Sequence, residues 1–170
     1  NSIRISSYTP KGIGYREFKK YGLLADSYFV SEKYEYDFTI REPLENSSFS
    51  DRENIFKAFV KFSYQLHNEN VLHLDFSPGN ILIKKENNTY VFKIVDINRM
   101  EFKSLSIDER ILNLSKLWAK DSDMVFIAQE YALLLGINDN HFVEKALDNS
   151  HKHKRFKNFK RRLKGKRVVE

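Results

Sequence analysis

The sequence has no cysteine, and it contains only three prolines and six glycines in 170 residues. Without cysteine the chain can form no disulfide, thiolate metal site or cysteine nucleophile, which suits a reducing compartment. No apolar run approaches the roughly 20 residues that a membrane-spanning helix needs, and no charged-then-apolar signal segment opens the chain. We therefore expect a soluble, non-secreted protein.

Positive charge is concentrated at one end of the chain. The net charge is +6, but residues 150–170 carry ten Lys or Arg and one Glu, so this segment has a charge of +9 and the remainder −3. Within residues 151–167, one edge carries Phe156, Phe159 and Leu163. This pattern is typical of a basic amphipathic helix on an anionic membrane surface.

Two alternatives for this basic tail remain open, namely a solvated charge run and a nucleic-acid patch. No nucleic-acid motif accompanies the tail, and the acidic remainder of the chain argues against broad binding to a phosphate backbone. We therefore expect an anionic membrane surface and no nucleic acid as partner.

With 41% apolar residues, a chain of this length can bury one core, so we expect one folded unit. Hydrophobic periodicity, turn residues and capping boxes predict a series of short strands and longer helices. The predicted elements are paired strands 12–18 and 28–32, a helix after the capping box 50–53, a hairpin of 81–83 with 91–95, a helix after the capping box 106–109, and a helix 122–135 ended by Gly136.

Each predicted helix has an apolar face. The first carries Ile55, Phe59, Phe62 and Leu66 at helical spacing, widened by Phe56 and Val60, and the second carries Ile107, Ile111, Leu114 and Trp118. The mixture of small sheets and helices predicts an α+β fold.

A polar loop separates the first helix from the hairpin. Residues 73–80 supply the carboxylate of Asp75 and the amide of Asn80, and Asp96 ends the hairpin with a second carboxylate. If these segments converge, three hard oxygen donors face one cavity. Phosphoryl transfer needs such a set, because Mg²⁺ must neutralise phosphate oxygens while a base orients the acceptor hydroxyl.

The spacing resembles the catalytic loop of the protein-kinase superfamily, in which a His-x-Asp is followed five residues later by Asn and, after a hairpin, by a metal-binding Asp. His73, Asp75, Asn80 and Asp96 occupy these positions. In detail the chain looks most like the bacterial lipopolysaccharide kinases that act on Kdo or heptose. The segments that carry this likeness are Tyr8-Thr9-Pro10, Tyr28–Glu32, Leu66-His67, His73–Ile83 and Asp96–Arg99, within a span of roughly Thr9 to Trp118.

The resemblance implies a protein-kinase-like fold, with a partial N-terminal lobe sheet followed by a mainly helical C-terminal lobe, and a role for each matching residue. Asp75 would be the catalytic base, Asn80 and Asp96 would hold Mg²⁺, and the backbone from Glu32 through Tyr34 would form the hinge that meets the adenine of ATP. Residues 1–33 would be a remnant of the N-terminal lobe with the hinge, 34–149 the catalytic lobe, and 150–170 the basic tail.

The implied reaction is ATP-dependent phosphorylation of a sugar hydroxyl of the lipopolysaccharide core or a lipid A precursor. The enzyme would lie on the inner face of the bacterial inner membrane. Two other functions stay open: a small-molecule kinase of the aminoglycoside or choline kinase type, and a pseudokinase that only binds a partner or nucleotide.

The sequence departs from the protein-kinase pattern in ways that favour a small-molecule acceptor. No Arg separates His73 from Asp75, and Asp96 is not followed by Phe-Gly. A glycine-rich phosphate loop, a Val-Ala-Ile-Lys-like strand and a helix with the partner Glu are also lacking, since the third glycine after Gly12 and Gly14 would fall at Glu17. Because the chain begins at Asn1 rather than Met, we expect that upstream residues supply these parts.

Three further residues near the motif have simpler expected roles. His73 is expected to support the catalytic loop, and His67 to form hydrogen bonds at the end of its helix. Arg99 either contacts a substrate phosphate or forms a local ion pair.

Overall fold

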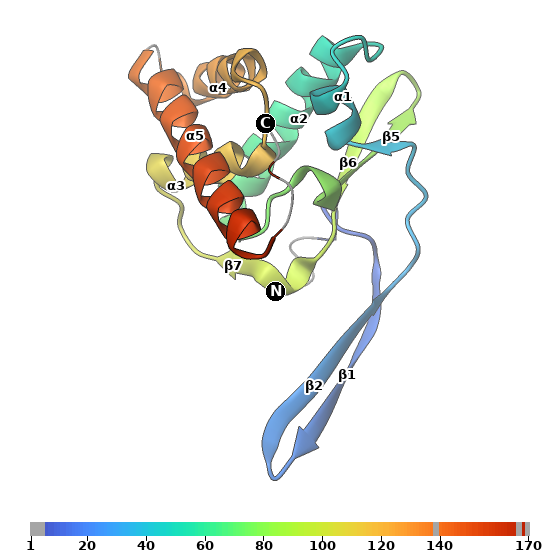
Figure 1. Ribbon diagram of the computed structural model, residues 1–170. Helices are drawn as coiled ribbons and strands as arrows, with labels where there is room; N and C mark the ends of the chain where they lie inside the picture. Colours follow the sequence, from blue (N-terminus) through green and yellow to red (C-terminus); the bar gives the residue numbers. More distant parts are fainter. Residues whose placement is uncertain (1–5, 138–139, 166–167, 169–170) are drawn as a thin grey trace.

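The computed structural model describes residues 6–137, 140–165 and 168. Three small antiparallel sheets precede a helical C-terminal part, which agrees with the predicted α+β class (Figure 1). The elements are β1 (Gly12–Lys20), β2 (Leu23–Ser31), β3 (Phe38–Thr39), α1 (Arg41–Glu45), α2 (Arg52–Asn68), β4 (Val71–His73), β5 (Ile81–Glu86), β6 (Thr89–Ile94), β7 (Met100–Phe102), α3 (Ile107–Leu114), α4 (Asp121–Leu135) and α5 (Asn140–Leu163), with 3-10 turns at Pro78–Asn80, Ile97–Arg99 and Ser115–Leu117.

The first hairpin extends away from the rest of the chain (Figure 1). Strands β1 and β2 pair antiparallel, as predicted, and both run further toward the turn than the sequence indicated. Tyr21 and Gly22 have φ values of 52° and 77°, the pair of positive angles that a two-residue hairpin turn requires. Large apolar side chains on this hairpin, such as Tyr15 and Leu23, are exposed to solvent.

The second hairpin forms the sheet that leads into the predicted catalytic segments. Strand β5 pairs antiparallel with β6 from Ile81 opposite Ile94 to Glu86 opposite Thr89, and β3 pairs with the other edge of β5. Asn87 and Asn88 adopt φ values of 46° and 63° in the turn, because Asn tolerates the left-handed region better than most residues. The predicted hairpin is confirmed.

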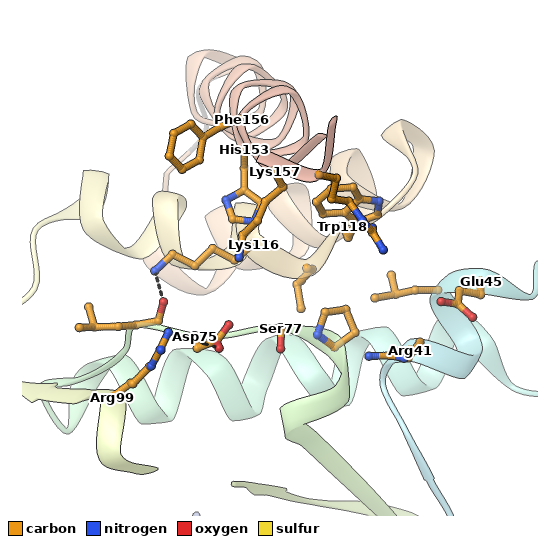
Figure 2. Close-up of a pocket in the computed structure, with 15 residues that line it drawn as sticks. Arg41, Glu45, Asp75, Ser77, Arg99, Lys116, Trp118, His153, Phe156 and Lys157 are labelled. Carbon is orange, nitrogen blue, oxygen red and sulfur yellow. Dashed lines mark hydrogen bonds and ion pairs between the residues drawn. The ribbon is translucent and has the colours of Figure 1, made fainter. Parts of the chain in front are cut away.

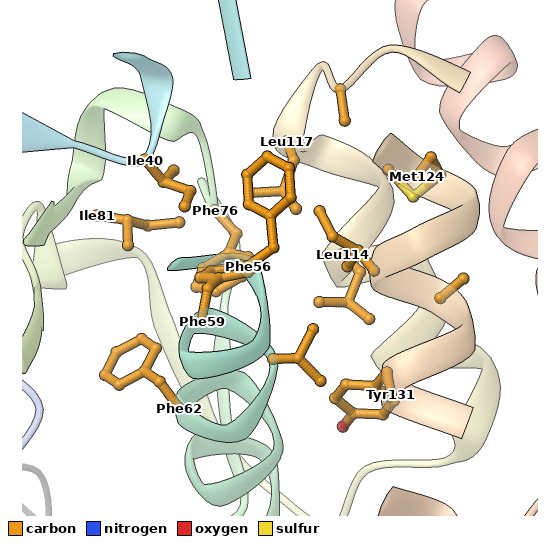
Figure 3. Close-up of a cluster of buried hydrophobic side chains, with 14 of the residues drawn as sticks. Ile40, Phe56, Phe59, Phe62, Phe76, Ile81, Leu114, Leu117, Met124 and Tyr131 are labelled. Atoms are coloured by element: carbon orange, nitrogen blue, oxygen red, sulfur yellow. The ribbon is translucent and has the colours of Figure 1, made fainter. Parts of the chain in front are cut away.

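Helix α2 lies at the centre of the core, and the apolar face predicted for it is confirmed (Figure 3). Ile55, Phe59 and Leu66 are completely buried, and α2 packs against α4, β4 and β6. Two aromatic pairs stack across this core: Phe59 on Phe76, with ring centroids 5.9 Å apart, and Phe62 on Phe92 at 5.2 Å. The core thereby fixes Phe76, a residue of the polar loop.

One of the two predicted capping boxes is wrong. Asp51, not Ser50, is the N-cap of α2, and it has a left-handed φ of 58° with no capping hydrogen bond from its side chain. Its carboxylate instead accepts hydrogen bonds from Tyr90 Oη at 2.7 Å and Asn54 Nδ2 at 2.6 Å. Because the Asp51 carboxylate accepts from a tyrosine of the β5–β6 hairpin, it does not accept from the backbone N–H groups at the start of α2.

The second capping box is confirmed, whereas the apolar face predicted beyond it is only partly correct. Ser106 Oγ accepts from the Glu109 N–H, and the Glu109 carboxylate accepts from the Ser106 N–H at 2.9 Å. Ile111 and Leu114 are buried, but Ile107 is 47% exposed. Trp118 lies beyond the helix in a left-handed conformation, with φ 58°, because the chain turns there toward α4.

The C-terminal part consists of two helices packed on each other. Helix α4 ends, as predicted, at Gly136, whose φ is 68°. Helix α5 is continuous from Asn140 to Leu163, so the basic tail predicted from residue 150 is the second half of a longer helix that the sequence did not indicate. Residues 166–167 and 169–170 of that prediction, and 1–5 of the predicted N-terminal remnant, lie outside the described residues.

The start of the basic segment packs against the body of the protein. His151 Nε2 lies 2.9 Å from a carboxylate oxygen of Asp121, and the His153 ring packs edge-on against Trp118 at 6.0 Å. No helix in the described part of the chain is both long and apolar enough to cross a membrane.

Candidate active site

The polar loop between β4 and β5 is closed by hydrogen bonds of its own. The Asp75 carbonyl accepts from the Ser77 N–H at 2.7 Å and from Asn80 Nδ2 at 2.9 Å. Phe76 is completely buried, whereas Asp75 is only partly covered. The loop therefore anchors an apolar side chain in the core and leaves the Asp75 carboxylate at the surface of a cavity.

His73 joins this loop to the end of β6. Its Nδ1 accepts a hydrogen bond from the Asp75 N–H at 3.1 Å, so the ring proton lies on Nε2, which donates to the Val95 carbonyl at 2.9 Å. Burial lowers the pKa of His73 below its usual value, although the nearby carboxylates of Asp75 and Asp96 act in the opposite direction. His73 is neutral at pH 7 and supports the loop, as predicted.

Asn80 and Asp96 flank the open end of the β5–β6 hairpin. The Val95 N–H donates to the Asn80 carbonyl at 3.0 Å, next to the paired residues Ile81 and Ile94. Asp96 follows β6 with a left-handed φ of 60° and an exposed side chain. One histidine and one short hairpin end therefore connect the segments of Asp75, Asn80 and Asp96. The expected single cavity is not found, because Asp75 and Asp96 line two different cavities and Asn80 lines neither of them.

The donor set of Asn80 and Asp96 fits Mg²⁺. Since Asn80 uses its Nδ2 toward the Asp75 carbonyl, its Oδ1 is the atom left for a ligand. One carboxylate and one amide oxygen are sufficient for Mg²⁺, which keeps several waters and takes the remaining ligands from substrate phosphates. The described residues contain no cluster of three His, Cys, Asp or Glu side chains that would suit a tighter metal site.

A chain of hydrogen bonds between buried side chains connects the predicted catalytic loop at His73 to α3, α2 and α4. The Asn113 Nδ2 donates to the His73 carbonyl at 2.8 Å, and its Oδ1 accepts from His67 Nε2 at 3.0 Å. The other nitrogen of His67 lies 2.7 Å from Tyr131 Oη. The hydrogen-bonding role predicted for His67 is confirmed. Asn113 was missed, and a polar residue beside the apolar stripe of α3 was the only sign of it in the sequence.

Two cavities flank these residues and have no lining residue in common. The acceptor-side cavity, as we name the one beside Asp75, has a volume of about 530 Å³ and lies between the loop and helix α5 (Figure 2). The nucleotide-side cavity, beside Asp96, has a volume of about 380 Å³ and is also lined by Pro10, Phe29 and Ser31.

The predicted hinge lies at the border of the nucleotide-side cavity. Ser31 lines this cavity, but Glu32 and Tyr34 are not among its lining residues. The Glu32 N–H donates to the Lys11 carbonyl at 2.8 Å, and Tyr34 is half-buried, with the Nζ of Lys93 6.0 Å from its ring centroid. Glu32 and Tyr34 thus lie to one side of the segments that His73 and the hairpin end connect.

Arg99 forms a local ion pair, one of the two roles considered for it. One guanidinium nitrogen lies 3.8 Å from the Asp75 carboxylate, and the Arg99 side chain is mostly exposed. The Leu74 N–H also donates to the Arg99 carbonyl at 2.7 Å, which fixes the backbone beside the loop. Arg99 therefore places a positive charge next to the predicted base.

No family model matches this chain. A comparison of folds finds a solved structure described as WaaP in complex with acyl carrier protein, with a TM-score of 0.62 and 14% sequence identity. The match covers 89% of this chain and 73% of that chain. At this identity the likeness shows the fold alone, and the chain has a WaaP-like fold.

Proposed function

We propose that the protein is an ATP-dependent phosphotransferase that phosphorylates a sugar hydroxyl, of Kdo or heptose, in the lipopolysaccharide core or a lipid A precursor. The observation that carries this proposal is the bridge made by His73, which holds the segments of Asp75 and Asp96 between two separate cavities. The fold likeness to WaaP, a kinase of the lipopolysaccharide core, supports the acceptor class.

Asp75 would act as the base in the proposed reaction. The acceptor oxygen forms a bond to the γ-phosphorus of ATP, the bond to ADP breaks, and the hydroxyl proton passes to the Asp75 carboxylate. The partial exposure of this carboxylate leaves it accessible to an acceptor, and a guanidinium nitrogen of Arg99 lies 3.8 Å from it.

Asn80 and Asp96 would hold Mg²⁺, which neutralises phosphate oxygens when it is bound. Asp96 lines the cavity that Ser31, next to the predicted hinge, also lines, and this supports the assignment. The backbone from Glu32 through Tyr34 would approach the adenine from the neighbouring border of that cavity.

Acceptor profiling with the full-length protein tests the proposed function. Labelled ATP and Mg²⁺ are supplied with Kdo–lipid A, a heptose-containing core acceptor, an aminoglycoside or choline, and Asp75→Ala is assayed in parallel. We expect label on one of the first two acceptors and none with the variant. Transfer only to the aminoglycoside or choline would establish the other kinase class, and absence of both transfer and ATP binding would establish a pseudokinase.

We also propose that the second half of α5 attaches the protein to an anionic membrane, at the inner face of the bacterial inner membrane. Phe156, Phe159 and Leu163 are each more than half exposed and lie along one edge of a helix rich in Lys and Arg. Each basic residue near an anionic surface contributes about 1 kcal/mol.

The matched pair of variants for this proposal removes exposed apolar side chains from two different helices. Phe159→Ser combined with Leu163→Ser should reduce co-sedimentation with vesicles that contain anionic lipid. Leu133→Ser, at an equally exposed apolar position on α4, should leave co-sedimentation unchanged. Unchanged co-sedimentation of the double variant would contradict membrane attachment through α5.

A further inference from the structure

The acceptor-side cavity carries an excess of positive charge. Five of its lining side chains are Lys or Arg and two are carboxylates, so its formal charge is +3. The five cations come from four parts of the chain that are distant in sequence: Arg41 in α1, Arg99 before β7, Lys116 in the turn after α3, and Lys157 and Arg161 in α5.

Most of this charge is not neutralised inside the protein. Among the described residues, Arg41, Lys157 and Arg161 have no acidic side chain within ion-pair distance, whereas Lys154, which precedes them on α5, lies 3.9 Å from Asp121. The charge of Lys154 is balanced within the protein by Asp121. The charges of Arg41, Lys157 and Arg161 around one cavity are not balanced in this way, which favours the binding of an anionic ligand there.

The positive charges around the cavity affect the pKa values of two side chains that line it, Lys116 and His153. Burial lowers the pKa of Lys116 below its usual value; the charge of Asp75 acts against this, and the charge of Lys157 acts in the same direction as burial. Burial likewise lowers the pKa of His153, and Lys157 and Lys116 add to the effect. These cations therefore lie close enough to repel each other, an arrangement that an anion between them would relieve.

One of the cations lies directly against the loop that carries the predicted base. A Cβ at Gly79 would lie 2.7 Å from an Nη atom of Arg41, so this guanidinium packs on the backbone of the loop. Figure 2 shows Arg41 and Arg99 on either side of Asp75 and Ser77, with Lys116 and Lys157 on the opposite wall.

We propose that this cavity is an anion subsite, in which Lys157, Arg161 and Arg41 bind a phosphate or carboxylate group that the acceptor already carries next to the hydroxyl presented to Asp75. The inference rests on the proposed function for the role of Asp75. Helix α5, whose second half the sequence predicted to lie on an anionic membrane surface, would then also form one wall of the anion subsite.

The location of the cavity favours the acceptor over the nucleotide. Asp96 and the residues near the predicted hinge line the other cavity, on the far side of the His73 bridge. The phosphates of ATP belong next to Asp96, whereas the anion subsite faces Asp75.

The only tryptophan of the chain, Trp118, lines the anion subsite, so its fluorescence reports binding there. The full chain is titrated with glucose 6-phosphate, glucuronate and glucose at constant ionic strength. We expect a saturable change with the sugar phosphate and the sugar acid and none with glucose. Lys157→Ala combined with Arg161→Ala should weaken anion binding about tenfold or more, because charge-assisted hydrogen bonds are lost.

The matched control is Arg162→Ala combined with Lys164→Ala, which removes the same charge from the last turn of α5 and the turn that follows it, outside the cavity lining. Equal weakening in both double variants would overturn the subsite, because binding would then depend on the charge of the helix as a whole. The subsite is also overturned if neither anion changes the fluorescence, if glucose acts like the anions, or if Mg-ADP competes with the sugar phosphate.

Kinetics separate this inference from the proposed function. With an active full-length enzyme, loss of Lys157 and Arg161 should raise the KM for an anionic acceptor about tenfold with little change in the KM for ATP. Active enzyme with an unchanged acceptor KM would contradict the subsite and leave the phosphotransferase intact. Anion binding that depends on these two residues, without any transfer, would contradict the phosphotransferase and leave the subsite intact.

Discussion

The stability of the protein should fall as the pH decreases from about 6.5 to about 4, and one buried side chain accounts for much of this change. His67 is completely buried, and burial lowers its pKa from the ordinary 6.5 to about 4. Its Nε2 donates to Asn113 Oδ1, whose orientation is fixed because Asn113 Nδ2 donates to the His73 carbonyl. Nδ1 must then accept from the Tyr131 hydroxyl, whose own pKa is raised to about 12 by burial.

A second proton on His67 would break this arrangement, because Nδ1 could no longer accept from the Tyr131 hydroxyl and the added positive charge would be buried. The unfolded chain binds a proton near pH 6.5 and the folded chain only near pH 4. The stabilisation is therefore fully present above pH 6.5 and is lost as the pH falls toward 4. From these two values, the free energy of unfolding should decrease by about 2 kcal/mol between pH 7 and pH 5 because of His67 alone.

Urea unfolding of the wild type and His67→Gln at pH 7 and pH 5 measures this contribution. The variant should be less stable at pH 7, because Gln cannot reproduce both hydrogen bonds. Its stability should nevertheless change about 2 kcal/mol less between the two pH values than that of the wild type. The comparison isolates His67 from His73, whose pKa is also lowered by burial. An equal pH dependence in both proteins would refute the argument.

Three further predictions concern stability and nucleotide binding. Arg52→Ala removes the ion-pair partner of Asp123, whose side chain is only 4% exposed, and should lower the free energy of unfolding in urea by about 3–5 kcal/mol. A decrease below about 1 kcal/mol would contradict a buried ion pair. Gly136→Ala places a Cβ on a left-handed backbone with φ 68° and open space around it, so thermal unfolding should show a loss of about 1–2 kcal/mol, and no loss would contradict the cap. The 170-residue chain should bind Mg-ATP poorly, because it lacks a glycine-rich phosphate loop, and micromolar affinity by calorimetry would contradict this expectation.

Local signals in the sequence were sufficient for part of the fold. Asn87 and Asn88 predicted the hairpin turn because both tolerate positive φ, and Gly136 predicted the end of α4 for the same reason. The capping box at Ser106 was correct because its hydrogen bonds join residues only three positions apart. Each of these features is determined by interactions between residues that are close in sequence, so the sequence alone was sufficient to predict it.

Features that depend on distant parts of the chain could not be predicted in this way. The capping box at Ser50 was wrong: Asp51 is the N-cap, and its carboxylate accepts from Tyr90, 39 positions later. Similarly, the motif located Asp75, but the unpaired cations Lys157 and Arg161 reach its cavity only because α5 folds back across the loop. The sequence showed their charge and gave no indication of the carboxylate that they face.

The most direct test of the account is the rate of phosphoryl transfer from Mg-ATP to a Kdo or heptose acceptor, compared between the full-length wild type, Asp75→Asn and Ser77→Ala. Ser77 lies two residues along the same loop and lines the same cavity. Loss of a general base should lower kcat by roughly 10²–10⁴-fold in Asp75→Asn, while Ser77→Ala stays within about tenfold of wild type. Transfer by Asp75→Asn at the wild-type rate would contradict the assignment of this loop as the active site.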